Sequence, residues 1–181
     1  MKKIITHSFV FLFFLISFHT KGIDRPNILL IVADDLGYHD LSCQGATDIF
    51  TPAIDNIAKS GIRFTSGYVT APQCGPSRAG LMTGVSQNRF SYLDNSNHSG
   101  IPKQNVLPTM SEQFTDLGYK TGIIGKWHVG HVVDDLGRYN LAGNNPWERG
   151  FQYVLIHEGG GSHYFPYSTG GENWMTSRGR E

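Results

Sequence analysis

The sequence predicts an α/β domain with a largely parallel central sheet. The run 27–33, Asn-Ile-Leu-Leu-Ile-Val-Ala, is apolar throughout and rich in branched side chains, which is typical of a strand buried on both faces. Downstream, segments with helical periodicity alternate with short segments that resemble strands. Because ligands of such sheets bind outside the carboxyl ends of the strands, polar residues that directly follow strands are the first candidates for a site.

Composition limits the classes of protein that this chain can represent. The 181 residues include 15 Lys+Arg, 15 Asp+Glu and 39% hydrophobic residues, so a single packed domain is expected. The balanced charge argues against a nucleic-acid-binding protein. The two cysteines are too few for a disulfide-based scaffold.

The N-terminus has the pattern of a secretory signal peptide. Lys2 and Lys3 precede an apolar run over 9–18, and small or polar residues follow over 19–22. The apolar run is shorter than the roughly 20 residues that a membrane helix needs. A buried helix or an uncleaved anchor is the alternative. We therefore expect residues 1–22 to be removed, the mature chain 23–181 to be exported, and membrane contact to occur only through the signal segment.

Three helices are expected in the mature chain. Pro52–Ser60 lies between a good N-cap, Thr51, and a terminating glycine. The second is expected over 76–83. The third spans 110–117 and begins with the capping-box pair Thr109 and Glu112.

Two short strands are also expected, over 63–69 after the first helix and over 120–124 after the third. From Val132 onward the chain is rich in Gly, Asn and aromatic residues, and it is expected to be mainly loop.

Asp34 and Asp35 directly follow the first predicted strand. Two adjacent carboxylates repel each other, and a hard cation such as Ca²⁺ or Mg²⁺ would relieve that repulsion. Taken alone, the pair is also compatible with a solvated turn or a helix N-cap.

Cys74 precedes the predicted helix 76–83, and Arg78 follows it by about one helical turn. Unpaired backbone N–H groups at a helix start favour anions and lower a thiol pKa. A lone cysteine is otherwise most often a small buried apolar residue.

These residues form part of a longer pattern. The run Cys-Gly-Pro-Ser-Arg over 74–78, followed by Ala-Gly-Leu-Met-Thr-Gly over 79–84, resembles the signature of the type I sulfatases. Gly-Lys-Trp-His over 125–128 is similar to the second family signature. Further similar stretches occur in the family's order at 26–37, 51–55, 61–65 and 150–151. The resemblance covers about residues 25 to 155.

The resemblance implies an alkaline-phosphatase-like sandwich and a set of roles. Asp34 and Asp35 would ligate Ca²⁺, with Mg²⁺ as a possible substitute. Cys74, oxidised to Cα-formylglycine by a formylglycine-generating enzyme, would be both a metal ligand and the nucleophile. Arg78 would hold the aldehyde hydrate.

The second signature supplies the other implied roles. Lys126 would contact the sulfate and His128 would transfer a proton, whereas Trp127 is expected in the core. His163, in a glycine-rich aromatic stretch, could touch a sugar ring, although a surface loop is equally compatible. Export together with this stretch favours a sulfated carbohydrate over a small aryl sulfate.

The pattern is incomplete relative to the family. A later Asp-Asn or Asp-Gln metal pair, a second Lys and a second His are not found, so we expect residues 23–181 to be the N-terminal portion of a catalytic domain. The alternatives are a phosphonate or phosphate ester hydrolase of the same superfamily, and an inactive sulfate- or glycan-binding remnant. Oxidation of Cys74 requires that it remain unpaired with Cys43.

Overall fold

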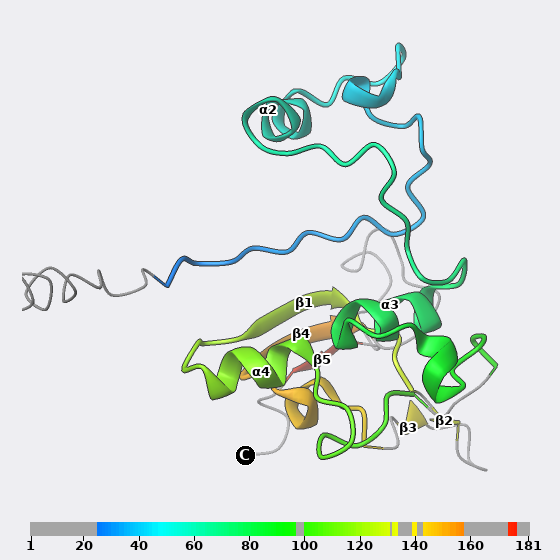
Figure 1. Cartoon of the computed structure of the whole chain (residues 1–181), viewed down its shortest axis with the longest axis vertical. Coiled ribbons are helices and arrows are strands. Elements are labelled where there is room, and N and C mark those ends of the chain that lie inside the picture. Colours follow the sequence, from blue (N-terminus) through cyan, green and yellow to red (C-terminus); the bar gives the residue numbers. More distant parts are fainter. Residues whose placement is uncertain are drawn as a thin grey trace, which may run out of the picture.

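The computed structural model describes residues 25–96, 100–130, 132–133, 139–140, 143–157 and 174–176 (Figure 1). The signal peptide predicted for 1–22 lies outside these residues. Within them the element order is η2 (Ser42–Gln44), α2 (Pro52–Ser60), α3 (Cys74–Thr83), η3 (Gln87–Phe90), α4 (Met110–Asp116), β1 (Gly122–Lys126), β2 (Val132–Val133), β3 (Tyr139–Asn140), η4 (Pro146–Arg149), β4 (Tyr153–His157) and β5 (Trp174–Thr176).

The main sheet has the strand order β1-β4-β5. Strands β1 and β4 are parallel, in a register that pairs Gly122 with Tyr153 and Lys126 with His157. Strand β5 is antiparallel to β4, and β2 pairs with β3 in a separate antiparallel ladder. The predicted α/β class is confirmed. The sheet is small, and β1 and β4 are the one parallel pair among the described strands.

The core lies where α3 and the sheet meet. Ala79 and Met82 of α3 pack with residues of β4 and of the segment that follows β1, and Met110 of α4 packs against the same cluster. Figure 1 shows α3 and α4 lying along the sheet near β1. The packing fixes the N-terminus of α3 beside the carboxyl end of β1.

Helices whose ends are marked by local signals are predicted accurately. Helix α2 has the predicted bounds, although the Thr51 side chain makes no capping hydrogen bond. Helix α4 has the predicted capping box of Thr109 and Glu112 and ends at Asp116, one residue before the predicted end. Helix α3 begins at Cys74 rather than Pro76, with Gln73 as its N-cap, which corrects the prediction by two residues. Proline is compatible with any position in the first turn, because the N–H groups there lack helical partners. It is therefore a weak marker of the first residue.

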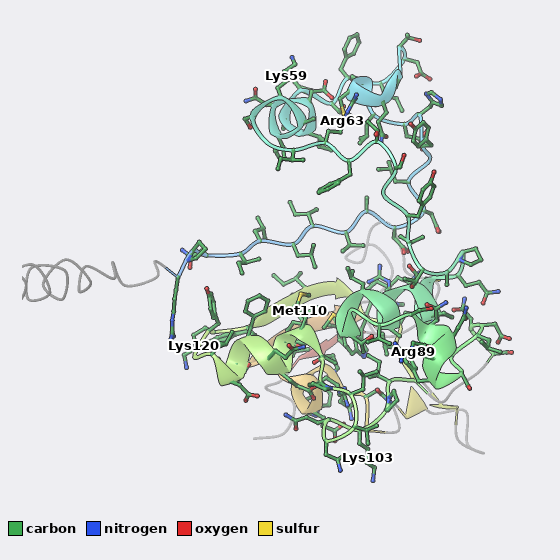
Figure 2. All side chains as sticks on the ribbon, in the orientation of Figure 1. Lys59, Arg63, Arg89, Lys103, Met110 and Lys120 are labelled. Atoms are coloured by element: carbon green, nitrogen blue, oxygen red, sulfur yellow. The ribbon has the colours of Figure 1, made fainter. Side chains whose placement is uncertain are left out.

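The predicted strand over 27–33 is wrong for the described structure. The segment is extended but carries no strand pairing, and Leu29 and Ile31 are 84% and 75% exposed. An open groove of about 1020 Å³ lies between this segment, β1 and α4. Figure 2 shows side chains projecting from both sides of the segment. Apolar composition predicts extended backbone, but a strand also needs a neighbour to pair with.

The other strand predictions need correction as well. Residues 63–69 form no strand and expose Phe64 and Tyr68, and the strand expected over 120–124 is displaced to Gly122–Lys126. The region after Val132 is not mainly loop in its described part, because it contains η4 and β4. Strand β4 has a sequence signal that could have predicted it, the apolar run Tyr-Val-Leu-Ile before His157.

A buried ion pair joins α4 to η4. Arg149 Nε lies 3.4 Å from Glu112 Oε1, and both side chains are 2% exposed. The guanidinium also donates to the carbonyl oxygens of Pro102 and Leu107, and Thr109 donates its hydroxyl to the carbonyl oxygen of Arg149. This network fixes η4, and with it the start of β4, against the N-terminus of α4.

Among the described residues, no helix has the length and apolar character needed to cross a membrane.

Candidate functional site

A carboxylate and two cations meet at the carboxyl end of β1. Asp34, at the end of the extended segment, accepts from Arg78 Nη2 at 3.1 Å and from Lys126 Nζ at 2.8 Å, each through a different oxygen. Arg78 also donates from Nη1 to the carbonyl oxygen of Lys126 at 2.6 Å. Three segments far apart in the sequence are thereby joined, and all three residues are among those predicted for the site.

The electrostatics of this contact favour the ionised carboxylate. Partial burial alone would raise the pKa of Asp34, but the hydrogen bonds from Lys126 and Arg78 outweigh that effect and lower it. The Lys126 side chain is 9% exposed, so its ammonium is mostly withdrawn from water. Asp34 is therefore the anion that both cations contact in this structure.

Cys74 occupies the first turn of α3, within the helix rather than before it. Its Sγ accepts a hydrogen bond from Asn95 Nδ2 at 3.7 Å. Arg78 lies one turn further along the same helix, so α3 places the thiol and the guanidinium at one end of the domain. Both cysteines are free, as predicted for Cys74.

The second predicted signature continues from the end of β1. Trp127 is buried, as predicted, and its Nε1 donates to the carbonyl oxygen of Asn144 at 2.8 Å. His128 is also buried and has a positive φ of 50°, a conformation that non-glycine residues adopt uncommonly. The chain therefore turns sharply at the residue for which a proton-transfer role was predicted.

The helix start and the end of β1 are packed backbone against backbone. A Cβ placed on Gly75 would lie 3.2 Å from the carbonyl oxygen of His128 and 2.6 Å from the hydroxyl of Tyr92. Tyr92 is buried, its hydroxyl accepts from Gly130 N–H at 3.3 Å, and burial raises its pKa. A larger residue at position 75 would collide with both groups, so the glycine lets the start of α3 approach the backbone of His128 closely.

The donor chemistry at Asp34 and Asp35 fits a hard cation, but the described residues do not complete its coordination. No group of three or more His, Cys, Asp or Glu side chains gathers in the part of the chain that the structure describes. Calcium takes about six to eight oxygen ligands. Asp35, with a φ of 57°, takes no part in the ion pairs of Asp34. The remaining ligands would have to come from elsewhere.

The structure thus unites Asp34, Arg78 and Lys126 directly and brings Cys74 and His128 into the same neighbourhood. His163 lies outside the described residues. Sequence reasoning missed Tyr92 and Asn95, which contact this neighbourhood from the segment after η3. Neither residue belongs to a periodic pattern, and only the tertiary structure reveals their position.

Comparison with known proteins decides the family. The sulfatase family model matches residues 26–177. The chain belongs to the sulfatase family. It is 42% identical, over 142 residues, to an N-acetylgalactosamine-6-O-sulfatase of Bacteroides thetaiotaomicron. The matched region covers 73% of this chain and 26% of the relative. It is 46% identical, over 109 residues, to human arylsulfatase A, which covers 58% of this chain and 21% of that relative.

Solved structures agree with this assignment. The crystal structure of Ps i-CgsB, also known in complex with k-i-k-neocarrahexaose, is 40% identical and superposes with a TM-score of 0.68. The match covers 80% of this chain and 30% of that one. The predicted fold family is confirmed. This sulfatase-family chain spans about a quarter of the length of the curated relatives that it matches.

Proposed function

We propose that this chain is the N-terminal portion, residues 23–181, of an exported sulfuric ester hydrolase. The observation that carries the proposal is the cationic contact of Arg78 and Lys126 at the carboxyl end of β1, beside the first turn of α3. A sulfate ester is an anion, and two buried or half-buried cations on rigid elements are suited to bind it. Membership of the sulfatase family supports the same conclusion.

Lys126 and Arg78 act together on the anionic group. Lys126 is held at the end of a strand and Arg78 on a helix, so neither cation must be ordered at the moment of binding. Arg78 additionally fixes the strand end through its bond to the carbonyl oxygen of Lys126. A sulfate placed here would contact charges that are already oriented.

Cys74 is proposed as the nucleophile in modified form. When oxidised to Cα-formylglycine by a formylglycine-generating enzyme, the residue would supply a hydrated aldehyde. One of its hydroxyls would attack sulfur and expel the alcohol of the ester, and loss of the proton from the other would then eliminate sulfate and restore the aldehyde. His128 follows on the neighbouring segment, where it can move a proton at that hydroxyl. Asp34 and Asp35 would help to hold Ca²⁺, or Mg²⁺ in its place, which would offset the charge of the sulfate.

The proposed substrates are sulfated carbohydrates. One relative named N-acetylgalactosamine-6-O-sulfatase and one neighbour solved with k-i-k-neocarrahexaose support this class. Steryl-sulfatase and arylsulfatases are also among the relatives, so an aryl sulfate is the natural test substrate. His163 is proposed as a contact to the sugar.

The experiment compares the full-length enzyme with its Cys74→Ala variant on sulfated oligosaccharides, an aryl sulfate and a phosphate diester. We expect calcium-dependent release of sulfate by the wild type, and none by the variant. Intact mass should show position 74 about 18 Da below cysteine, since sulfur is replaced by oxygen and two hydrogens are lost in the modification. Phosphate diester turnover that exceeds sulfate turnover would favour the phosphoesterase alternative. Unmodified Cys74 without turnover would favour a binding remnant.

A further inference from the structure

We propose that Asn95 is the positioning residue for Cys74, which it holds in place from a separate segment of the chain. The inference rests on the proposed role of Cys74. Asn95 Oδ1 accepts the Gly75 N–H at 3.0 Å, and Asn95 Nδ2 donates to Cys74 Sγ at 3.7 Å. One amide side chain therefore holds both the backbone next to Cys74 and the side chain of Cys74.

The first contact replaces a missing helix cap. Gln73, the N-cap of α3, makes no side-chain capping hydrogen bond. Pro76 has no N–H, and Ser77 N–H already donates to the carbonyl oxygen of Gln73. Gly75 N–H has no partner within the helix at this position, because the first four amides of a helix lack one. Asn95 satisfies this donor from 20 residues away.

The capping is reciprocal, which fixes both segments. The Gln73 side chain in turn accepts the Asn95 N–H through Oε1 at 2.7 Å. Two hydrogen bonds in opposite directions therefore join the start of α3 to the segment after η3. Such a pair restricts rotation as well as distance, so the orientation of Cys74 depends on both segments.

The same segment also reaches the histidine side of the site. Tyr92, three residues before Asn95, accepts the Gly130 N–H, two residues beyond His128. Residues 92–95 thus contact α3 and the chain after β1 at the same time. A shift of this segment would move Cys74 relative to His128, and displacements of about 1 Å at a reacting group can reduce the rate about 100-fold.

The amide geometry separates two roles that substitutions can distinguish. Asn95→Ala removes both the acceptor for Gly75 and the donor to position 74. Asn95→Asp keeps an acceptor for Gly75 N–H but has no donor, and it adds a negative charge. Asn105→Ala is the matched control, because Asn105 is an exposed asparagine outside this contact.

The test measures turnover and hydrogen–deuterium exchange in the full-length protein. We expect Asn95→Ala to lower kcat roughly 10- to 100-fold with KM little changed. Exchange at Gly75 should accelerate about tenfold, which corresponds to the loss of one hydrogen bond. Asn95→Asp should retain the protection of Gly75 but not the turnover, and Asn105→Ala should match the wild type in both. Intact mass of each variant reports whether position 74 is modified, which separates poor positioning from poor maturation.

The outcomes are decisive in each direction. Wild-type kcat or wild-type exchange at Gly75 in Asn95→Ala would overturn the proposal, as would full turnover in Asn95→Asp. A wild-type protein that hydrolyses no sulfate ester would contradict the proposed function instead. Exchange at Gly75 would then still decide whether Asn95 holds the start of α3.

Discussion

Asp34 has two competing uses at the residue scale. Its carboxylate neutralises Arg78 and Lys126, and the same carboxylate is a proposed ligand of a metal ion. A cation that attracts this carboxylate would weaken its hold on Lys126 and Arg78. The two cations would then be better able to bind a sulfate group. We therefore interpret Asp34, Arg78 and Lys126 as parts of one binding site rather than as a surface salt bridge.

Replacement of Lys126 by methionine tests the cationic half of the site. We expect Lys126→Met to lower kcat/KM of the full-length enzyme by about 100- to 1,000-fold, because one charge on the developing anion is lost. Lys120→Met is the matched control, since Lys120 is exposed and lies two residues before the start of β1, at the end of the strand away from Lys126 (Figure 2). Steady-state assays on an aryl sulfate measure both. Equal losses in the two variants would contradict a specific role for Lys126.

Replacement of Asp35 by asparagine tests the metal half. Asp35→Asn keeps the size of the side chain and removes one anionic ligand, so calcium affinity and turnover should fall together. High calcium should restore part of the turnover by mass action. Calorimetric titration measures calcium affinity, and assays with and without chelator measure turnover. Asp48→Asn is the control, because Asp48 is exposed. Undiminished turnover of the wild type in excess chelator would argue against the metal.

At the scale of elements, the Glu112–Arg149 pair determines where β4 starts. Both charges are buried, and the arginine also bonds to two carbonyl oxygens of the segment before α4. Desolvation opposes the charged form of Arg149 and lowers its pKa, while Glu112 opposes that shift. Because β4 is the partner of β1, this pair supports the sheet edge from which Lys126 projects.

Removal of one charge of this pair should destabilise the domain. We expect Arg149→Met to reduce the free energy of unfolding by about 3 to 5 kcal/mol, because Glu112 would remain buried without a counter-charge. The double variant Glu112→Leu with Arg149→Met should lose less than the sum of the single losses. Denaturant unfolding measures these values, and Arg89→Met at an exposed arginine should change stability by less than about 0.5 kcal/mol (Figure 2).

At the scale of the whole molecule, the segment 27–33 leaves its apolar side chains largely exposed. Its apolar side chains border an open groove beside β1, and hydrogen bonds hold the chain near each of its two ends. Arg25 donates to the carbonyl oxygen of Leu117 at 2.6 Å, and Asp34 holds the other end. The segment therefore lies beside the edge strand β1, where a further strand of the sheet would lie. It does not form the backbone hydrogen bonds that would make it a strand.

Residues 23–181 expressed alone should therefore be poorly stable and inactive. We expect binding of a hydrophobic dye, association during size-exclusion chromatography and no calcium-dependent turnover of an aryl sulfate, even with a formylglycine-generating enzyme present. Leu29→Ser with Ile31→Ser should reduce dye binding in this piece, yet destabilise the full-length protein if the segment is buried there. A soluble monomer with a sharp unfolding transition and calcium-dependent turnover would contradict this prediction.

Local signals in the sequence determined most of the helices and identified the family. A capping box marks the start of α4 and Pro52 the start of α2, because the first amides of a helix lack helical partners and must be satisfied locally or be absent. The signatures around Cys74 and Lys126 identified the family, since a dense set of reactive side chains at fixed spacing is specific. Tertiary structure alone decided which extended segments pair, because strand pairing depends on partners distant in sequence. Tertiary structure decided that β4 pairs with β1 and that segment 27–33 pairs with no described strand. It also decided that Asn95 contacts Cys74, because these residues are 21 positions apart in the sequence.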